Sequence, residues 1–367
     1  MKIFILAGEP SGDEYGARLM QNIAENTQNV HFIGIGGPLM SKQGLNSMVP
    51  LQKMSVMGFF EIIKTLPFFI KLEKNILKLI VTQKPDKIIL IDYPGLNLRL
   101  APKIKSRIKT QIFYYISPQI WAWKEKRIEI IKKYVDKMIV IFEFEKKWYQ
   151  KRGVEADYVG HPFLDIWNKN NTKNLIEKHE IDKTRPILTL FPGSRKQELK
   201  KHLQLFISVA LRLKENIPNL QILLGLHPEI QLTHQINQQI IIINDEPLKA
   251  LELANVAIVA SGTATLQAAI LNTPTVVVYK MNALSWFLTR WMVRVKYASM
   301  ANIISEEKVF PEYLQKDATI KNIYQAAYKM FINDHYRQTL IQKITTINQK
   351  IGNRGASKRA AESIINN

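Results

Sequence analysis

The chain has 367 residues, 46% of them hydrophobic, which is enough for a substantial core and favours two or three domains. Its 51 Lys and Arg against 31 Asp and Glu give a formal net charge of +20, which favours anionic partners: nucleic acid, phosphorylated substrates or acidic lipid surfaces. Because there is no cysteine, disulfides, thiolate metal sites and cysteine nucleophiles are excluded, and a cytosolic compartment fits this composition.

Short β-branched runs recur in two blocks, and a loop and a helical pattern follow each run. The first block predicts strands at 3–7, 30–34, 87–92, 111–116 and 138–142. The second predicts strands at 187–191, 220–224, 240–243, 256–260 and 275–279. Alternating strands and helices indicate parallel sheets covered on both faces, so the expected fold class is α/β with two Rossmann-like, doubly wound domains.

Three stretches bear on the domain organisation: a polar linker, the last segment of the chain, and a long apolar run. Residues 167–185 are polar and show no strand pattern, so they are predicted to be a linker between domains at 1–168 and 185–345. The last segment is predicted to be a polar helix pair that packs on either domain, and helix 346–367 is a candidate to pack back on the first. Residues 253–279 match a membrane span in length, but two polar turns divide them into a buried βαβ unit.

The first loop carries acids where many nucleotide-binding folds carry phosphate contacts. Gly8, Gly12 and Gly16 are four residues apart, which is not the dinucleotide spacing. Because acids repel phosphates, Glu9, Ser11 and Asp13 are interpreted as sugar or polyol contacts. The alternative is that Asp13 only adds a favourable charge to the first helical turn.

Asp92 ends a predicted strand, at the sheet edge where open α/β folds bind their ligands. A carboxylate there is a candidate general base for a hydroxyl group if its surroundings tune its pKa. Asp before Tyr-Pro-Gly is also a common turn former, so both interpretations stay open.

Two later loops have the composition of anion sites at helix starts. The first, Pro192-Gly193-Ser194-Arg195, precedes a helix with Glu198 in its first turn, and is either a phosphate site or a capping box in which Ser194 is the cap. The second, residues 261–265, suits a pyrophosphate on free N–H groups, with Gln267 in reach of a ribose hydroxyl; the alternative is a plain N-cap.

Two further segments combine apolar and basic residues. Residues 114–127 place Ser117 and two tryptophans beside three cations, as in a base-stacking or lipid-headgroup surface, or in the core and rim of one helix. Residues 57–80 suggest a basic amphipathic surface for membrane or acyl chains, or ordinary buried helices. The seven histidines show no metal-ligand spacing, so no metal site is expected; His161 either faces a cleft or caps a turn.

Taken together and in order, these segments resemble the lipid-A-disaccharide synthase family over nearly the whole chain. The likeness rests on AGEPSGDEYGA, IDYPGLNLRLA, ISPQIWAWKEKR, FEFEKKWY, YVGHPFLD, LFPGSRKQEL, ASGTATLQA, VVVYKMNALSWFL and MANIISEEKVFPEYLQ. The resemblance implies a GT-B fold whose two domains face a central cleft, and an inverting hexosyltransferase. The implied reaction transfers diacylglucosamine from UDP-diacylglucosamine to the 6-hydroxyl of diacylglucosamine 1-phosphate, giving a β-1,6-linked disaccharide and UDP, with no metal and no cofactor.

The resemblance also implies roles for particular residues. The catalytic set would be Asp92 as the base with Glu9 and Asp13, and the acceptor contacts would be Ser11, Gly12, Ser117 and His161. The UDP contacts would be Gly193, Ser194, Arg195, Glu198, Ser261, Gly262, Thr263, Ala264, Thr265, Gln267 and Asn302. Gln267 stands where the family usually has Glu, which predicts weaker UDP binding.

The same resemblance implies a cytoplasmic enzyme, peripheral on the anionic inner face of the cytoplasmic membrane, and a homodimer is compatible with it. Two rival functions remain open. A UDP-N-acetylglucosamine 2-epimerase would also bind UDP in the second domain. A nucleic-acid-binding protein is supported by the net charge and the Trp-Lys segment alone.

Overall fold

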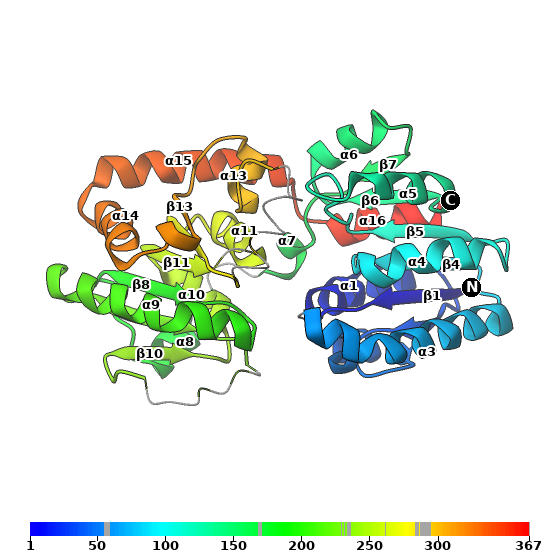
Figure 1. Ribbon diagram of the computed structural model, residues 1–367, viewed down its shortest axis with the longest axis horizontal. Coiled ribbons are helices and arrows are strands. Elements are labelled where there is room, and N and C mark those ends of the chain that lie inside the picture. The colour runs from blue at the N-terminus through cyan, green and yellow to red at the C-terminus, as the bar shows by residue number, and fades with distance from the viewer. Residues whose placement is uncertain are drawn as a thin grey trace. The chain divides into compact units, whose positions relative to one another are not determined.

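The computed structural model describes residues 1–54, 59–167 (59–65 as backbone), 171–228, 230, 232, 236–260, 262–282, 286 and 295–366. The chain divides into two compact units, residues 1–167 with 351–367 and residues 168–350, drawn in Figure 1. Each unit has its own sheet and its own core.

Unit 1 is built on a seven-stranded sheet in the order β3-β2-β1-β4-β5-β6-β7, and all of its pairings are parallel. Its strands are β1 (Lys2–Ala7), β2 (His31–Ile35), β3 (Asn46–Ser47), β4 (Lys87–Ile91), β5 (Gln111–Tyr115), β6 (Lys137–Val140) and β7 (Ala156–Tyr158). The chain turns back at β1, so the loops after β1 and β4 leave neighbouring strands in opposite directions. This topological switch point is where open α/β sheets bind ligands.

Helices cover both faces of this sheet because successive strand residues point to opposite sides. They are α1 (Pro10–Asn26), α2 (Pro38–Lys42), α3 (Phe59–Gln83), α4 (Pro94–Lys105), α5 (Ile128–Tyr134), α6 (Glu143–Gln150), α7 (Phe163–Ile166) and α16 (Ala356–Ile365), with 3-10 turns η1 (Leu51–Lys53) and η2 (Glu125–Arg127). Phe4, Leu90 and Tyr114 face the core under α3 and α4. On the other face, Gly16 of α1 packs against Ile91.

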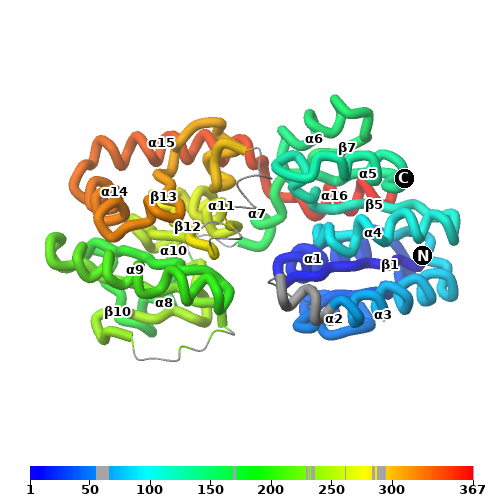
Figure 2. The backbone as a smooth tube through the Cα atoms, in the orientation of Figure 1, coloured from blue at the N-terminus to red at the C-terminus, as the bar shows by residue number. Residues whose placement is uncertain are grey.

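Unit 1 is completed by a segment from the far end of the sequence. Helix α16 packs against α1, and Figure 2 shows the two side by side although they stand at opposite ends of the colour scale. Asp165 accepts hydrogen bonds from the amides of Gly355 (2.5 Å) and Ser357 (2.7 Å), which fixes the start of α16. Unit 1 is therefore built from two segments of the sequence, one before unit 2 and one after it.

Unit 2 repeats the design with a six-stranded parallel sheet in the order β10-β9-β8-β11-β12-β13. Its strands are β8 (Ile187–Phe191), β9 (Gln221–Gly225), β10 (Ile240–Ile243), β11 (Val256–Ala260), β12 (Thr275–Tyr279) and β13 (Glu312–Leu314). Its switch point lies between β8 and β11, so the two predicted phosphate loops leave adjacent strands there.

Helices again cover both faces of the sheet of unit 2. They are α8 (Lys173–Lys178), α9 (Lys196–Asn216), α10 (Pro247–Leu253), α11 (Thr263–Ile270), α13 (Met300–Ser305), α14 (Ile320–Ile332) and α15 (Asp334–Ile351), with the 3-10 turn η3 (Gln315–Asp317). One core lies under α9 and α14, and a smaller one includes Leu175, Leu223 and Ala250. The expected α/β class with two doubly wound domains is confirmed.

One local expectation differs from the structure and another agrees with it. The stretch predicted as a linker contains α8, because Leu175 and Ile181 are buried against the sheet of unit 2 and fold the segment onto it. The stretch at 253–279 is the βαβ unit β11-α11-β12, as predicted. Among the helices that the structure describes, none combines the length and apolar character needed to cross a membrane.

Candidate active site

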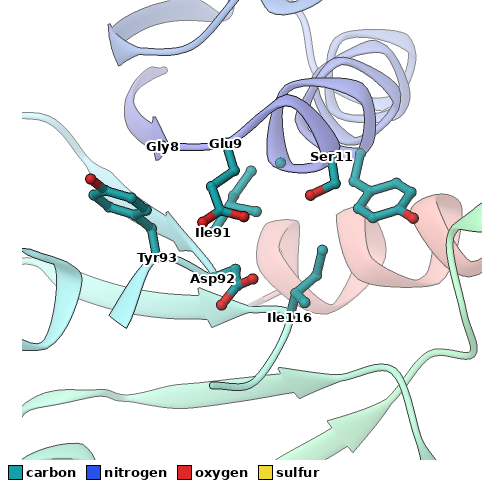
Figure 3. Close-up of a pocket in the computed structure, with 9 residues that line it drawn as sticks. Gly8, Glu9, Ser11, Ile91, Asp92, Tyr93 and Ile116 are labelled. Atoms are coloured by element: carbon teal, nitrogen blue, oxygen red, sulfur yellow. The ribbon is translucent and has the colours of Figure 1, made fainter. Parts of the chain in front are cut away.

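A pocket lies at the switch point of unit 1, where the first and fourth strands end. It is lined by Gly8, Glu9, Ser11, Gly12, Tyr15, Ile91, Asp92, Tyr93 and Ile116. Figure 3 shows the carboxyl groups of Glu9 and Asp92 pointing into the same space, with Ser11 beside them. Four of the predicted site residues thus share one pocket.

Strained backbone frames this pocket. Asp92 and Tyr93 have φ of +40° and +48°, and Ile116 across the pocket has φ of +64°. Left-handed conformations are uncommon outside glycine and are outliers for β-branched residues such as Ile116. Since strained residues persist only where their surroundings hold them, and cluster at functional sites, this edge has the character of an active site.

The turn at Asp92 is held by buried polar side chains behind it. The hydroxyl of Tyr114 donates to the Asp92 carbonyl at 2.5 Å, and Nδ2 of Asn97 donates to the same carbonyl at 2.7 Å. Asn97 is fully buried and also reaches the carbonyl of Ile91 at 3.2 Å. Asp92 therefore forms a turn, as one interpretation had it, and also presents its carboxyl group to the pocket.

The ring of Tyr93 joins the two loops. It packs so closely on Gly8 that a Cβ there would lie 2.4 Å from the ring, so only glycine fits. The hydroxyl of Tyr93 donates to the carbonyl of Met54 at 2.8 Å, which anchors the ring at its far end. The separation of the Glu9 and Asp92 loops is therefore fixed by packing.

The surroundings of Asp92 raise the pKa of its carboxyl group well above the usual value for an aspartate. Burial, and after it the nearby charge of Glu9, together raise the pKa of Asp92 to about 7, against the lowering effect of a backbone hydrogen bond from Tyr93. A carboxyl group with a pKa near the working pH is a suitable general base, since it is partly ionised and still accepts a proton readily.

Asp13 has a different place from the one the sequence predicted. It is buried, and its carboxylate accepts hydrogen bonds from the backbone amides of Gly37 (2.8 Å), Leu39 (3.0 Å) and Met40 (2.9 Å). These amides begin α2, so Asp13 caps that helix from α1 and does not line the pocket. The catalytic role expected for Asp13 is corrected to a structural one.

Two predicted acceptor contacts are also engaged inside the fold. The hydroxyl of Ser117 bonds with Tyr149 at 2.9 Å and with the carbonyl of Pro118 at 3.1 Å. His161 is buried, its ring meets Tyr15 edge-on at 6.0 Å, and its Nδ1 accepts the Phe163 amide at 3.2 Å. Burial lowers the pKa of His161 to about 3, so the ring is neutral. It packs against Tyr15, which lines the pocket.

At the switch point of unit 2, the loop after β8 is shaped by Gly193 and Glu198. Gly193 has φ of +119°, and Glu198 bends back to accept the Ser194 amide at 3.0 Å. Helix α9 begins at Lys196 with Arg195 as N-cap, and no side chain caps it. Ser194 is therefore not the cap that the alternative required, and Glu198 positions the loop.

His202 links the loop after β8 to Lys280, the residue that follows β12. The ring is fully buried; Nδ1 donates to the carbonyl of Pro192 at 3.0 Å, and Nε2 accepts the amide of Lys280 at 2.8 Å. The sequence analysis did not identify His202. Its only signal there is a histidine on the apolar side of a helix that follows a glycine loop.

The second loop of unit 2 also opens an uncapped helix. Gly262 has φ of +138° and free space around its Cβ position, and the amides of α11 follow it. Thr263 and Ala264 lie in the first turn and Gln267 in the second, half-buried; Ser261 lies outside the described residues. The hydroxyl of Thr265 is used within the helix, where it donates to the carbonyl of Gly262 at 2.8 Å.

Asn302 is fully used by its own surroundings. Its Nδ2 donates to Phe310 and Glu312, both at 2.8 Å, and its Oδ1 accepts the amides of Val309 and Phe310. With every side-chain donor and acceptor engaged and no exposed surface, Asn302 supports the chain after α13, and the expected UDP contact is corrected.

Solved structures with this fold include nucleotide-sugar enzymes. The chain superposes with a TM-score of 0.68 on UDP-GlcNAc 2-epimerase from Neisseria meningitidis, at 12% identity and with full coverage of both chains. It superposes with a TM-score of 0.64 on the glycotransferase of kitacinnamycin, at 11% identity over 100% of this chain and 98% of the other. At such identities the likeness establishes the fold, that of GT-B glycosyltransferases and epimerases.

Sequence comparison identifies the family. The lipid-A-disaccharide synthetase family model matches residues 3–365. Proteins named lipid-A-disaccharide synthase are similar to the chain in Coxiella burnetii (34% identity, 99% of this chain and 98% of the relative) and Myxococcus xanthus (32%, 99% and 97%). The chain therefore belongs to the lipid-A-disaccharide synthetase family of glycosyltransferases.

Proposed function

We propose that this protein transfers a 2,3-diacylglucosamine from its UDP conjugate to the 6-hydroxyl of 2,3-diacylglucosamine 1-phosphate. The products would be a β-1,6-linked disaccharide 1-phosphate and UDP, formed by a single inverting displacement without metal. The observation that carries the proposal is the Asp92 carboxyl group, held in the pocket of unit 1 with a pKa raised to about 7. Membership of the family supports the same reaction.

In the proposed step, Asp92 removes the proton of the acceptor 6-hydroxyl while that oxygen attacks the anomeric carbon of the donor. The bond from this carbon to the UDP oxygen breaks, and UDP leaves with the electron pair. Glu9 and Ser11, which share the pocket with Asp92, would hold the sugar hydroxyls. Because the base must be ionised, the rate should rise with pH through about 7.

We assign the UDP group to the switch point of unit 2. The uncapped first turns of α9 and α11 offer free backbone N–H groups, and the half-exposed guanidinium of Arg195 lies beside the first of them. Helix starts and arginine are favoured partners for phosphate oxygens. The same groups would stabilise the negative charge that develops on the departing UDP.

The epimerase alternative is not favoured, because the likeness to epimerases is one of fold at low identity whereas the family match covers the whole chain. We also propose that residues 59–80 contact the membrane, that the protein is peripheral on the inner membrane, and that it forms a homodimer. Vesicle flotation with anionic lipids and light scattering of the purified protein would test them.

The deciding experiment is incubation of the purified protein with UDP-diacylglucosamine and diacylglucosamine 1-phosphate in the presence of EDTA. We expect stoichiometric UDP and disaccharide phosphate, with a β linkage by proton NMR. Release of UDP without a disaccharide, or a strict requirement for added metal, would contradict the proposal.

Asp92→Ala should reduce kcat by roughly a hundredfold to ten-thousandfold, the range that a general base contributes. UDP binding, measured by titration calorimetry, should be unchanged because the base lies in the other unit. Near-normal turnover of this variant would place the base elsewhere.

A further inference from the structure

The loop after β5 carries two cations on one tryptophan. Nζ of Lys124 lies 4.5 Å from the centroid of the Trp123 ring, and Cζ of Arg127 lies 5.9 Å from it. Lys124 has φ of +56° as the N-cap of η2, and its carbonyl accepts the Arg127 amide at 2.9 Å. This tight turn brings the two positive side chains together.

These cations lack an acidic partner among the residues that the structure describes. Glu125, in the same turn, is held by Arg152 at 2.6 Å, on the side of Trp148. Burial lowers the pKa of Lys124, and the like charge of Arg127 lowers it further. Two like charges on one ring repel each other, so an anion placed between them would be stabilised by both.

Buried side chains anchor the loop that carries these cations. Ile120 and Ala122 are buried, and Nε1 of Trp121 donates to Oε1 of the buried Glu145 at 3.0 Å. Because residues on both sides of Trp121 are packed, the turn that follows is presented in a fixed place. A preorganised pair of cations binds a ligand at a smaller entropic cost than two mobile side chains.

The cation pair lies on the same side of unit 1 as the Asp92 turn. Strands β4 and β5 are neighbours, and the loops that carry Asp92 and Arg127 follow them. Burial raises the pKa of Tyr114 well above its usual range; Asp92 raises it further, and Arg127 lowers it. The Tyr114 hydroxyl, which donates to the Asp92 carbonyl, is thus within electrostatic reach of both residues.

We propose that Lys124 and Arg127, supported by the ring of Trp123, bind the 1-phosphate of the acceptor sugar. This inference rests on the proposed function, in which Asp92 deprotonates the 6-hydroxyl of that sugar. C1, which carries the phosphate, and C5, which carries the 6-hydroxymethyl group, flank the ring oxygen on its two sides, so an acceptor held at both groups spans the edge from β4 to β5. The site thereby selects a phosphomonoester at the reducing end.

The test compares two acceptors, diacylglucosamine 1-phosphate and the same sugar without its phosphate, in wild type, Lys124→Gln and Arg127→Gln. Lys126→Gln is the matched control, because Lys126 is an exposed cation of the same turn without a contact to Trp123. For the phosphorylated acceptor we expect KM to rise roughly tenfold to hundredfold in the two variants, as for loss of a charged hydrogen bond. The donor KM should not change.

On the phosphate-free acceptor, wild type and both variants should have equal kcat/KM, because the group that the cations bind is missing. Equal losses on both acceptors would overturn the proposal, as would a loss in Lys126→Gln of the same size. Circular dichroism and thermal unfolding of each variant establish that it is folded.

A binding measurement separates this inference from the proposed function. We expect the ³¹P NMR signal of glucosamine 1-phosphate to broaden with wild type and with Lys126→Gln, and to stay sharp with Arg127→Gln. If wild type fails to form a disaccharide but this pattern holds, the proposed reaction fails and the phosphate site stands. If all three proteins behave alike, the phosphate site fails whatever the turnover.

Discussion

In the proposed mechanism the chemistry depends on Asp92, and Glu9 is the neighbour that adjusts its pKa. Burial makes the larger contribution to the raised pKa of Asp92, and the charge of Glu9 the second. One carboxylate therefore tunes another across a pocket that both of them line.

Glu9→Gln should lower the pKa of Asp92, because the neutral amide no longer disfavours the ionised carboxylate. The rate requires that ionised form, so the acidic limb of the pH profile of kcat should move from about 7 towards lower pH. Glu14→Gln on the same helix, outside the pocket, is the control and should leave the limb in place. A midpoint that stays at its wild-type value in Glu9→Gln would refute the coupling.

Arg195→Ala should weaken UDP binding roughly tenfold to hundredfold, the range for a lost charge-assisted hydrogen bond, and leave the acceptor KM unchanged. Lys196→Ala, an exposed neighbour, is the comparison for a general loss of positive charge. Calorimetric titration with UDP measures both. Equal affinities for Arg195→Ala and the wild type would remove Arg195 from the donor site.

The sequence predicted Asp92 and Glu9, which line one pocket, but could not separate Glu9 from Asp13, since both are acids in one loop. The difference arises from a second loop, whose Gly37 amide takes up the Asp13 carboxylate. The signal available was the start of α2, Gly36-Gly37-Pro38, which carries no capping side chain of its own. Asn302 could not be separated for the same reason, because its partners are main-chain groups that fold back onto it.

At the scale of elements, the turn between β4 and α4 has a strained backbone that side chains from β5 and α4 hold in place. The hydroxyl of Tyr114 on β5 and the amide of Asn97 on α4 both hold the Asp92 carbonyl. The side chain of Tyr115, the next residue of β5, points to the opposite face and makes no bond to that turn within the described residues; only the Tyr115 carbonyl does, accepting the Asp92 amide at 3.0 Å. Two adjacent buried tyrosines thus provide a matched pair.

Tyr114→Phe should lower kcat roughly fivefold, because one neutral hydrogen bond worth about 1 kcal/mol no longer holds the turn. The pH midpoint should fall with it, since a looser turn admits water to the Asp92 carboxyl group and lessens its desolvation. Tyr115→Phe should change neither quantity. If the two variants show the same pH profile as each other, the Tyr114 hydroxyl does not position the base.

The strands were predictable where they are buried on both faces. The ten predicted runs correspond to the ten longer strands, since parallel sheets covered by helices need continuous apolar segments. The short edge strands β3, β7 and β13 are only two, three and three residues long, and their polar residues break any such pattern. Helix α8 was missed because its few apolar residues, such as Leu175, are spread through a polar stretch.

At the scale of the whole molecule, the alternation of strands and helices predicts two Rossmann-like units, but periodicity alone does not say where the last helix belongs. Helix α16 has alanines and one buried isoleucine, Ile364, on its inner face, a pattern that fits many surfaces. Its place is set by partners distant in the chain: the surface of α1 and the carboxylate of Asp165.

We expect residues 168–350 to fold as an isolated fragment, because that unit is continuous in sequence and has its own core. Residues 1–167 alone should be less stable, since losing the burial of Ile364 costs about 1.5–3 kcal/mol and losing the other α16 contacts adds to this. Thermal unfolding of the two fragments, with and without a peptide of residues 351–367, measures the difference. No stabilisation by the peptide would contradict this account.

The split construction of unit 1 has a consequence for synthesis on the ribosome. Multidomain chains are commonly pictured as maturing from the amino end onwards, each domain folding as it emerges. Here unit 1, most of which is translated first, cannot complete its fold until residues 351–366 have been made. Unit 2 is translated before those residues, so it can reach its native state earlier. In the interval the nascent chain exposes the bare flank of α1, and that flank is where a chaperone would be needed.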